Sequence, residues 1–578
     1  MLNEKCLTKF GSEFIRLETN YSIMNHFLLG LAFTLVVYSG FSQKNKTVTV
    51  FGSLSFSTGF YQNNSSFAPN KQSPFFYSVS GSATIRVKNF SLPFSFTYSD
   101  QKFSHSNPFL RMGISPRYKW ITAHIGYSSI NYSSLILGGR QFLGVGIELS
   151  PNKFYFSVLY GKYDNLMSRP YNMATYSSPP IKAFDRYVYG GKIGYGDKTR
   201  LDLMVVKVKD DENSIPLEIS KESGFLPEDN MVVGINFKTQ INNRIFFDMS
   251  TAGSLHTANI NSDIDIETND DFKQVQGLNK FVTLNYSTRW GYAGEMNLKY
   301  KNKLFQIGAK YKRVEPNYRA LGVDYMRTDY ENYTLNFRTK LFKKRLRIKL
   351  KGGFQRNNLD LTRKATSLRK IARVNLNYNY KGFMAGINYN NTQSDQKAGY
   401  VELEDTLRLA VANNSTFVMV GYRWKKKSLR YNVNLNLGKT NFKELNSAYF
   451  VTVDNNTNNT FNVNFQLTHI PSTTTFSLGT NYYILESAGR KRVGNGINFG
   501  VGKKVFKKKI QIRFTTVITK RSVDGTDAGY SLRLRNNLSY NITKKQSFNF
   551  YISWAKSLNA KINLQDETRA NLSYRINF

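Results

Sequence analysis

The sequence predicts an all-β protein, a large closed antiparallel transmembrane β-barrel of about 26 strands with no separate plug domain. Two observations support this prediction. Apolar and polar residues alternate with a period of two along nearly the whole chain, and short turns alternate with longer connections between the alternating segments. An even number of strands would return both ends of the sheet to the same side of the membrane.

The composition fits one unit of this kind. The chain has 578 residues, with 80 Lys and Arg against 39 Asp and Glu, a formal net charge of +41, and 37 Tyr and 43 Phe. Its mean hydropathy of −0.42 argues against a bundle of membrane helices, because each helix would need about 20 consecutive apolar residues. Length alone would suggest several domains, but a large barrel can use this many residues as one.

The one apolar run lies near the start, in FLLGLAFTLVV at residues 27–37. It is too short for a typical membrane span, and the small residues Gly40 and Ser42 offer a cleavage point before Gln43. We therefore expect residues 24–42 to be a secretory signal peptide.

Met24 is then expected to be the true first residue, and residues 1–23 an over-extended start without a structural role. The only cysteine, Cys6, lies in that part. The barrel is predicted over residues 43–578, which would have no disulfide and no thiolate metal site.

Alternation begins in TVTVFGSLSF at residues 47–56, which leaves no room for a plug before the barrel. It is clearest in LRYNVNLNL (429–437), FNVNFQL (461–467) and SLRLRNNLSYNI (531–542). Successive side chains of a strand point to opposite faces, so each segment has one apolar and one polar face. Residues 279–302 could form one long strand or two.

Two kinds of connection alternate along the chain, as in outer-membrane barrels, which have tight periplasmic turns and longer extracellular loops. Short turns are predicted at 87–91, 150–153, 196–200, 240–244, 300–303, 342–345, 379–382, 424–428, 469–473, 505–509 and 543–547. Longer connections are predicted at 164–184, 254–278, 314–329, 394–414, 440–457 and 485–495.

The chain ends in LSYRINF, where Leu572, Tyr574, Ile576 and Phe578 alternate with polar residues. This ending resembles the assembly signal of Gram-negative outer-membrane β-barrel proteins, and with the signal peptide and repeated hairpins the resemblance covers essentially all of residues 43–578. The richness in Asn, Lys and Tyr resembles barrels of the Bacteroidota. The resemblance implies export to the cell outer membrane and contact with outer-membrane lipid and the barrel-assembly machinery, but it fixes no substrate.

A soluble, secreted β-repeat protein is the alternative fold. It is disfavoured because soluble strands rarely place aromatic residues on one face over so many consecutive hairpins. Aromatic residues near strand ends fit membrane-interface girdles and fit cross-strand packing pairs equally well. They are Tyr378, Tyr380, Trp424, Tyr482, Tyr540 and Trp554.

The basic residues do not form one patch, so no nucleic-acid partner is expected despite the net charge. Many lie on the polar faces of strands, and a Lys or Arg facing lipid near the midplane would cost about 2–4 kcal/mol. We therefore expect an electropositive lumen, which favours anions. The candidate pore-lining residues are Arg338, Arg345, Arg347, Lys349, Arg373, Arg430, Arg513, Arg533, Arg535, Arg569 and Arg575. Neutralisation by acidic residues, lipid headgroups or an inserted partner is the alternative.

No catalytic or cofactor-binding pattern stands out, and no enzyme is predicted. The chain has no HExxH, P-loop or GxSxG stretch. Its five histidines lack metal-binding partners; His124 is expected in a strand and His256 in a loop. The acidic segment 261–271 is interpreted as a solvated loop rather than a calcium site, and LGGRQFLGVG (137–146) as strand glycines rather than a phosphate cradle.

Two functional hypotheses remain open. One is a channel or transport barrel for anionic or polar solutes; the other is a structural or assembly subunit of an outer-membrane complex, whose lumen or periplasmic rim engages partner proteins. Porins of 16 to 18 strands already leave an aqueous channel. We therefore expect folded-in loops, inward side chains or a lumen-filling partner protein to occupy the interior.

Overall fold

The computed structural model describes residues 48–64, 74–99, 110–163, 184–215, 226–264, 277, 279–323, 325–400, 408–446, 455–558 and 566–578. The predicted signal peptide at 24–42 and the start at 1–23 lie outside these residues. In the part of the chain that is described, no helix is long and apolar enough to cross a membrane.

Nearly all regular structure is β-strand. The first strands are β1 (Val48–Asn63), β2 (Phe75–Val87), β3 (Phe90–Ser99), β4 (Leu110–Ile114), β5 (Arg117–Tyr118), β6 (Ile121–Ser128), β7 (Phe142–Leu149), β8 (Phe154–Tyr163), β9 (Asp185–Gly196) and β10 (Thr199–Asp211), followed by the short 3-10 helix η1 (Glu212–Ser214). Next come β11 (Asp229–Ile241), β12 (Ile245–Thr257), β13 (Thr288–Lys301), β14 (Phe305–Val314), β15 (Tyr330–Leu341), β16 (Leu346–Asn357), β17 (Ala365–Tyr380) and β18 (Phe383–Ala398). The last are β19 (Ala410–Lys426), β20 (Leu429–Glu444), β21 (Asn456–His469), β22 (Thr474–Ser487), β23 (Arg490–Val505), β24 (Ile510–Val523), β25 (Thr526–Asn541), β26 (Gln546–Leu558) and β27 (Asp566–Asn577).

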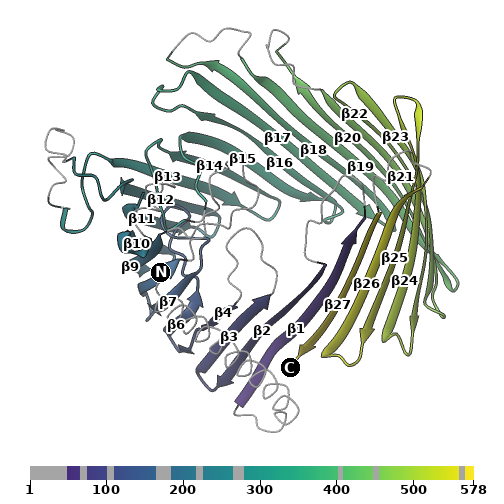
Figure 1. Ribbon diagram of the computed structural model, residues 1–578, viewed down its shortest axis with the longest axis horizontal. Helices are drawn as coiled ribbons and strands as arrows, with labels where there is room; N and C mark the ends of the chain where they lie inside the picture. The colour runs from purple at the N-terminus through teal and green to yellow at the C-terminus, as the bar shows by residue number, and fades with distance from the viewer. Residues whose placement is uncertain are drawn as a thin grey trace, which may run out of the picture.

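The strands form one closed barrel. Each strand pairs antiparallel with the next, except that β4 does not pair with β5, and β27 pairs with β1 (Figure 1). At this closing pair Ser53 lies opposite Asn577 and Phe60 opposite Ala570. Both β4 and β5 pair with β3 and with β6, so these two pieces share one position, interrupted at Ser115 and Pro116. The 27 strands therefore fill 26 positions, and the prediction of a closed antiparallel barrel of about this size is confirmed.

The two rims of the barrel differ. We call the rim where β1 begins and β27 ends the near rim, and the opposite one the far rim. The tight turns lie at the near rim, and every turn predicted as short lies there between two paired strands. Some of these turns need left-handed backbone: Phe342, Lys343 and Lys344 follow one another with φ of 51°, 56° and 70°. At the far rim the connections are mostly longer, as predicted.

Two stretches of the sequence were assigned wrongly or left open, and the structure decides both. The longer connection expected at 485–495 is wrong, because β22 and β23 continue to a two-residue turn at Ala488 and Gly489. Arg490, Lys491 and Arg492 interrupt the apolar alternation, but they are exposed strand residues in water beyond the apolar belt. The uncertain stretch 279–302 contains one strand, β13, which begins only at Thr288.

One face of the sheet is strongly apolar and exposed. On β10, Leu201, Leu203 and Val205 are 40–48% exposed, while Met204 and Val206, which point to the opposite face, are almost fully buried. A soluble protein rarely shows so continuous an apolar surface, whereas the outside of a membrane barrel must be apolar. This outward face therefore faces lipid, and the opposite, inward face lines the barrel interior.

Aromatic residues form rows on the outward face toward both rims. Near the turns, Trp424 stacks on Tyr431 with ring centroids 4.9 Å apart, and toward the far rim Tyr333 lies 4.7 Å from both Tyr311 and Phe354. The aromatic residues of these rows therefore form cross-strand pairs, and they also lie where the aromatic girdles of a membrane barrel are expected. All six aromatic residues singled out in the sequence have outward register.

Candidate functional site: the barrel interior

Two connections from the far rim fold onto the inward face of β8–β13. They are residues 129–141, between β6 and β7, and residues 315–323 and 325–329, between β14 and β15; together we call them the inner layer. Their apolar side chains bury against Val188, Val206 and Val232 of the wall. The expectation of folded-in loops is thereby met in this sector of the interior.

The two segments of the inner layer bind each other. The Gly138 amide donates to the Gly322 carbonyl at 3.3 Å, and Gly138 and Val323 form a parallel bridge. The buried Tyr318 hydroxyl donates to the Leu135 carbonyl at 2.7 Å. Because these contacts join residues far apart in sequence, the inner layer is one body rather than two independent loops.

Asn230 of β11 fixes this body to the wall. Its side chain is fully buried. Its Nδ2 donates to the carbonyls of Leu255 at 2.9 Å and Arg319 at 3.0 Å, and its Oδ1 accepts from the Leu321 amide at 3.0 Å. A second amide, Nδ2 of Asn236, donates to the Tyr132 carbonyl at 3.2 Å. Polar side chains on the inward face thus satisfy loop backbone that would otherwise be buried without partners.

A charged cluster holds the far-rim edge of the inner layer. Arg186 donates to Asp210 and to Glu228 at 2.6 Å each, and Arg319 of the inner layer donates to Glu228 at 3.4 Å. His256 lies 3.2 Å from Glu228. Burial raises the pKa of Glu228. The hydrogen bond with His256 and the charges of Arg186 and Arg319 together lower it by more, so the net pKa falls from 4.5 to about 2. Glu228 is therefore a carboxylate at neutral pH.

The placement expected for His256 is wrong, since this residue belongs to strand β12 rather than to a loop. The strand extends past the point where its apolar alternation ends, because its inward residues are covered by the inner layer. His124 lies in strand β6, as predicted, with Nε2 at 2.8 Å from Glu148.

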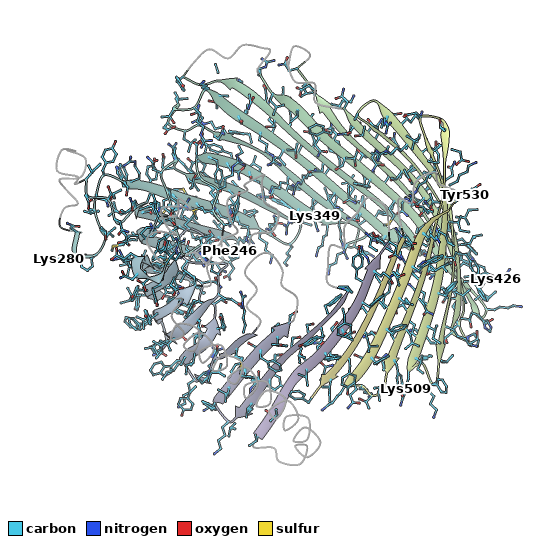
Figure 2. The ribbon with its side chains drawn as sticks, in the orientation of Figure 1. Phe246, Lys280, Lys349, Lys426, Lys509 and Tyr530 are labelled. Atoms are coloured by element: carbon cyan, nitrogen blue, oxygen red, sulfur yellow. The ribbon has the colours of Figure 1, made fainter. Side chains whose placement is uncertain are left out.

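A basic sector lies on the inward faces of β15, β16 and β17. Register places Arg338 opposite Lys349, Lys340 opposite Arg347, and Lys351 opposite Arg373. Figure 2 shows Lys349 at the inner side of the ring of strands. Among the described residues, no Asp or Glu has inward register on these three strands. On β13, two strands away from β15, Glu295 pairs with Lys310 of β14 at 2.6 Å and approaches Lys312 to 3.7 Å.

The remaining candidate residues are distributed around the rest of the barrel. Arg430, Arg513, Arg533, Arg535, Arg569 and Arg575 all have inward register. Arg569 donates to Glu567 at 3.1 Å and lies over the ring of Tyr61, with 5.1 Å from Cζ to the centroid. Arg345 does not lie on a strand, contrary to expectation; it is in the turn before β16, stacked over Tyr380 at 3.9 Å.

Uncharged polar side chains line most of the wall between these arginines. Asn434 and Asn436 of β20 lie opposite Asn464 and Asn462 of β21, and Asn462 also faces Asn481 of β22. Within the part of the chain described here, no group of three His, Cys, Asp or Glu side chains could hold a metal ion. Most of the acidic segment 261–271 lies outside the described residues.

The glycines of the segment 137–146 allow close backbone contacts. Gly138 belongs to the inner layer, and Gly144 and Gly146 lie in strand β7. A Cβ at Gly144 would lie 2.1 Å from the Tyr160 carbonyl oxygen, so close strand packing explains this glycine. Folded-in loops were expected, but neither their residues nor the wall that they cover was predicted. LMVV at 203–206 and MVV at 231–233 are apolar on both faces of their strands, which indicates burial on both sides.

Comparison with known proteins does not assign the chain to a family. No protein family matches the sequence, and no curated protein does. Among solved structures, the translocation pore of the P pilus usher PapC has a TM-score of 0.37 at 10% identity, covering 91% of this chain and 99% of that chain. The FrpB iron transporter of Neisseria meningitidis (F5-1 variant) has a TM-score of 0.38 at 10% identity, with coverages of 91% and 82%. OccK2 of Pseudomonas aeruginosa, solved with glucuronate, has a TM-score of 0.30 at 9% identity, with coverages of 92% and 98%.

Proposed function

We propose that this protein is an outer-membrane channel that admits anionic or polar solutes through its electropositive interior. The observation that carries the proposal is the basic sector, in which Arg338 and Lys349, Lys340 and Arg347, and Lys351 and Arg373 form like-charged cross-strand pairs. Like charges at directly opposed positions of neighbouring strands destabilise each other. The sector is therefore stabilised by whatever anions enter beside it.

The rest of the wall suits a channel for polar solutes. Asn, Ser and Thr side chains offer both donors and acceptors without fixing one charge, and the arginines among them add a positive potential that attracts anions. The inner layer covers the wall of β8–β13, so the proposed path runs along the opposite wall, past Arg373, Arg430 and Arg533.

Single-channel recording of the purified protein in planar bilayers tests this proposal. With a salt gradient across the membrane, the reversal potential should show anion selectivity. The triple charge reversal Arg347→Glu, Arg533→Glu and Arg575→Glu should shift the selectivity toward cations. The matched control is Lys509→Glu, which changes a charge in a near-rim turn at the periphery of the barrel (Figure 2). A cation-selective wild-type channel would refute the proposal.

A structural or assembly role is the second candidate. The near rim carries exposed lysines at 425–427 and 507–509, which could engage an acidic partner protein or lipid headgroups. This role predicts a barrel that conducts no ions and retains a partner through gentle extraction. A conducting, monodisperse monomer would exclude it.

Outer-membrane location and assembly belong to the same proposal. The apolar outward face requires a lipid bilayer, and a closed barrel of this kind is expected in an outer membrane. Leu572, Tyr574 and Ile576 have outward register, and Phe578 pairs with Gly52. We propose that these four residues are read by the barrel-assembly machinery, after export directed by residues 24–42.

A further inference from the structure

The outward face carries an apolar groove across β12–β17. Its volume is about 990 Å³. The floor includes the small residues Ala309 and Gly352, which lie on either side of Leu335 in the cross-strand register. A Cβ built on Gly352 would meet nothing within 4 Å, so the space over this glycine is open. The groove faces lipid, and its interior can hold an acyl chain that a flat barrel surface could not hold.

Aromatic rings close the far-rim end of the groove. Tyr311, Tyr333 and Phe354 lie side by side, with neighbouring ring centroids 4.7 Å apart. From Leu346 to Phe354 the strand advances by roughly 26 Å at about 3.3 Å per residue. A strand tilted by about 40° then reaches roughly 20 Å above the near-rim turn, close to the top of an apolar band about 25 Å tall. The aromatic row therefore lies near the level of the headgroups at the far rim.

Two basic side chains, Lys370 and Arg356, lie at the level of this aromatic row on the outward face. Lys370 lies directly opposite Phe354 in the register and is exposed. No carboxylate among the described residues pairs with it. Arg356, two residues beyond Phe354, donates through Nε to Glu331. Its side chain is 50% exposed, and its Nη groups have no partner among the described residues.

We propose that the groove and these two cations form a binding site for a phosphate-bearing lipid of the far-rim leaflet. The acyl chain would lie over Gly352, and the phosphate would contact Lys370 and Arg356. An ammonium and a guanidinium both bind phosphate oxygens well, and long basic side chains reach the interface while their stems cover apolar surface. An uncharged lipid would fill the groove but would leave Lys370 without an anion and the Nη groups of Arg356 without a partner among the described residues.

The test is native mass spectrometry of the full-length protein in detergent, titrated with dioleoyl phosphatidic acid. We expect one tightly retained lipid per barrel. Lys370→Gln and Gly352→Leu should each weaken retention at least tenfold, the first by removing charge and the second by filling the groove. Lys349→Gln, on the inward face, and Gly253→Leu, an outward glycine on β12 whose added Cβ also meets nothing within 4 Å, should leave retention unchanged.

Two further probes separate the parts of the site. Dioleoylglycerol, which lacks the phosphate, should bind at least tenfold more weakly, and inorganic phosphate should not compete. Equal retention of dioleoylglycerol, or retention unaffected by Lys370→Gln, would overturn phosphate recognition. Retention unaffected by Gly352→Leu would overturn the groove as the acyl site. None of these outcomes depends on whether the barrel conducts ions.

Discussion

At the scale of single residues, Asn230 determines whether the inner layer stays on the wall. Replacing it with Leu keeps its approximate size but removes the bonds to Leu255, Arg319 and Leu321. A buried backbone group left without a partner costs about 1–3 kcal/mol. We therefore expect Asn230→Leu to speed hydrogen exchange at 315–323 by roughly tenfold or more, while exchange in β20–β27 stays slow.

Asn464→Leu is the matched control for this change. Asn464 also has inward register, but it lies on β21, away from the inner layer. Unchanged exchange at 315–323 in Asn230→Leu would show that the apolar contacts alone hold the inner layer in place.

Glu228 makes the stability of the same region depend on pH. Its folded pKa, lowered from 4.5 to about 2, means that its contribution is complete above the unfolded value and is lost as pH falls through about 2. The shift corresponds to roughly 3 kcal/mol. The thermal midpoint of the wild type should therefore fall more steeply between pH 4.5 and 2 than that of Glu228→Gln, with both followed by circular dichroism. Parallel curves for the two proteins would contradict this assignment.

At the scale of elements, the near-rim turns depend on left-handed residues. Lys344 has a φ of 70° in the turn between β15 and β16. A β-branched side chain is poorly tolerated there, so Lys344→Val should destabilise the barrel by about 1 kcal/mol or more, whereas Lys344→Gly should not. Comparison of their urea midpoints tests this. Lys340→Val, at an exposed position of the adjoining strand β15, makes the same side-chain change in extended backbone and is the control for β-branching itself.

The same turns show which elements the sequence can predict. Clusters such as FKKR at 342–345 and NYKG at 379–382 combine turn residues with a break in alternation. Each short turn predicted from such a cluster lies between two paired strands, whereas the short turn between β5 and β6 was not predicted. The turn at Ala488 and Gly489 was missed because its flanking strands run into water, where both faces can be polar. The inner layer was missed for a different reason: its contacts, such as Tyr318 with Leu135, join segments that only the closed barrel brings together.

The candidate residues follow the same division. Strand period predicts that Arg338, Arg347, Lys349 and Arg373 lie on one face, and in the cross-strand register all four point to the inward face. Which of them meet across strands depends on pairing between hairpins, which alternation alone does not fix. The groove over Gly352 depends on the same pairing, since it needs Ala309 and Gly352 to flank Leu335.

At the scale of the whole molecule, closure depends on the seam between β1 and β27. The Gly52 amide donates to the Phe578 carbonyl at 3.1 Å, and the Phe578 amide donates to the Gly52 carbonyl at 3.1 Å. A Cβ on Gly52 would lie 2.2 Å from the Ser82 carbonyl oxygen and 3.0 Å from Cε2 of Phe578. The terminal ring therefore packs over a glycine, and there is no room for a larger residue.

We expect Gly52→Val to lower the yield of closed barrel severalfold, because β1 cannot approach β2 and Phe578 together and an unclosed barrel exposes two strand edges to lipid. Gly253→Val, at an outward glycine with open space above it, should fold normally. Protease resistance after refolding into vesicles measures the closed fraction. Deletion of Phe578 removes the two hydrogen bonds between Gly52 and Phe578 without adding bulk. If this deletion gives a normal yield of closed barrel and Gly52→Val a low one, closure depends on the packing of β1 on β2 and not on Phe578.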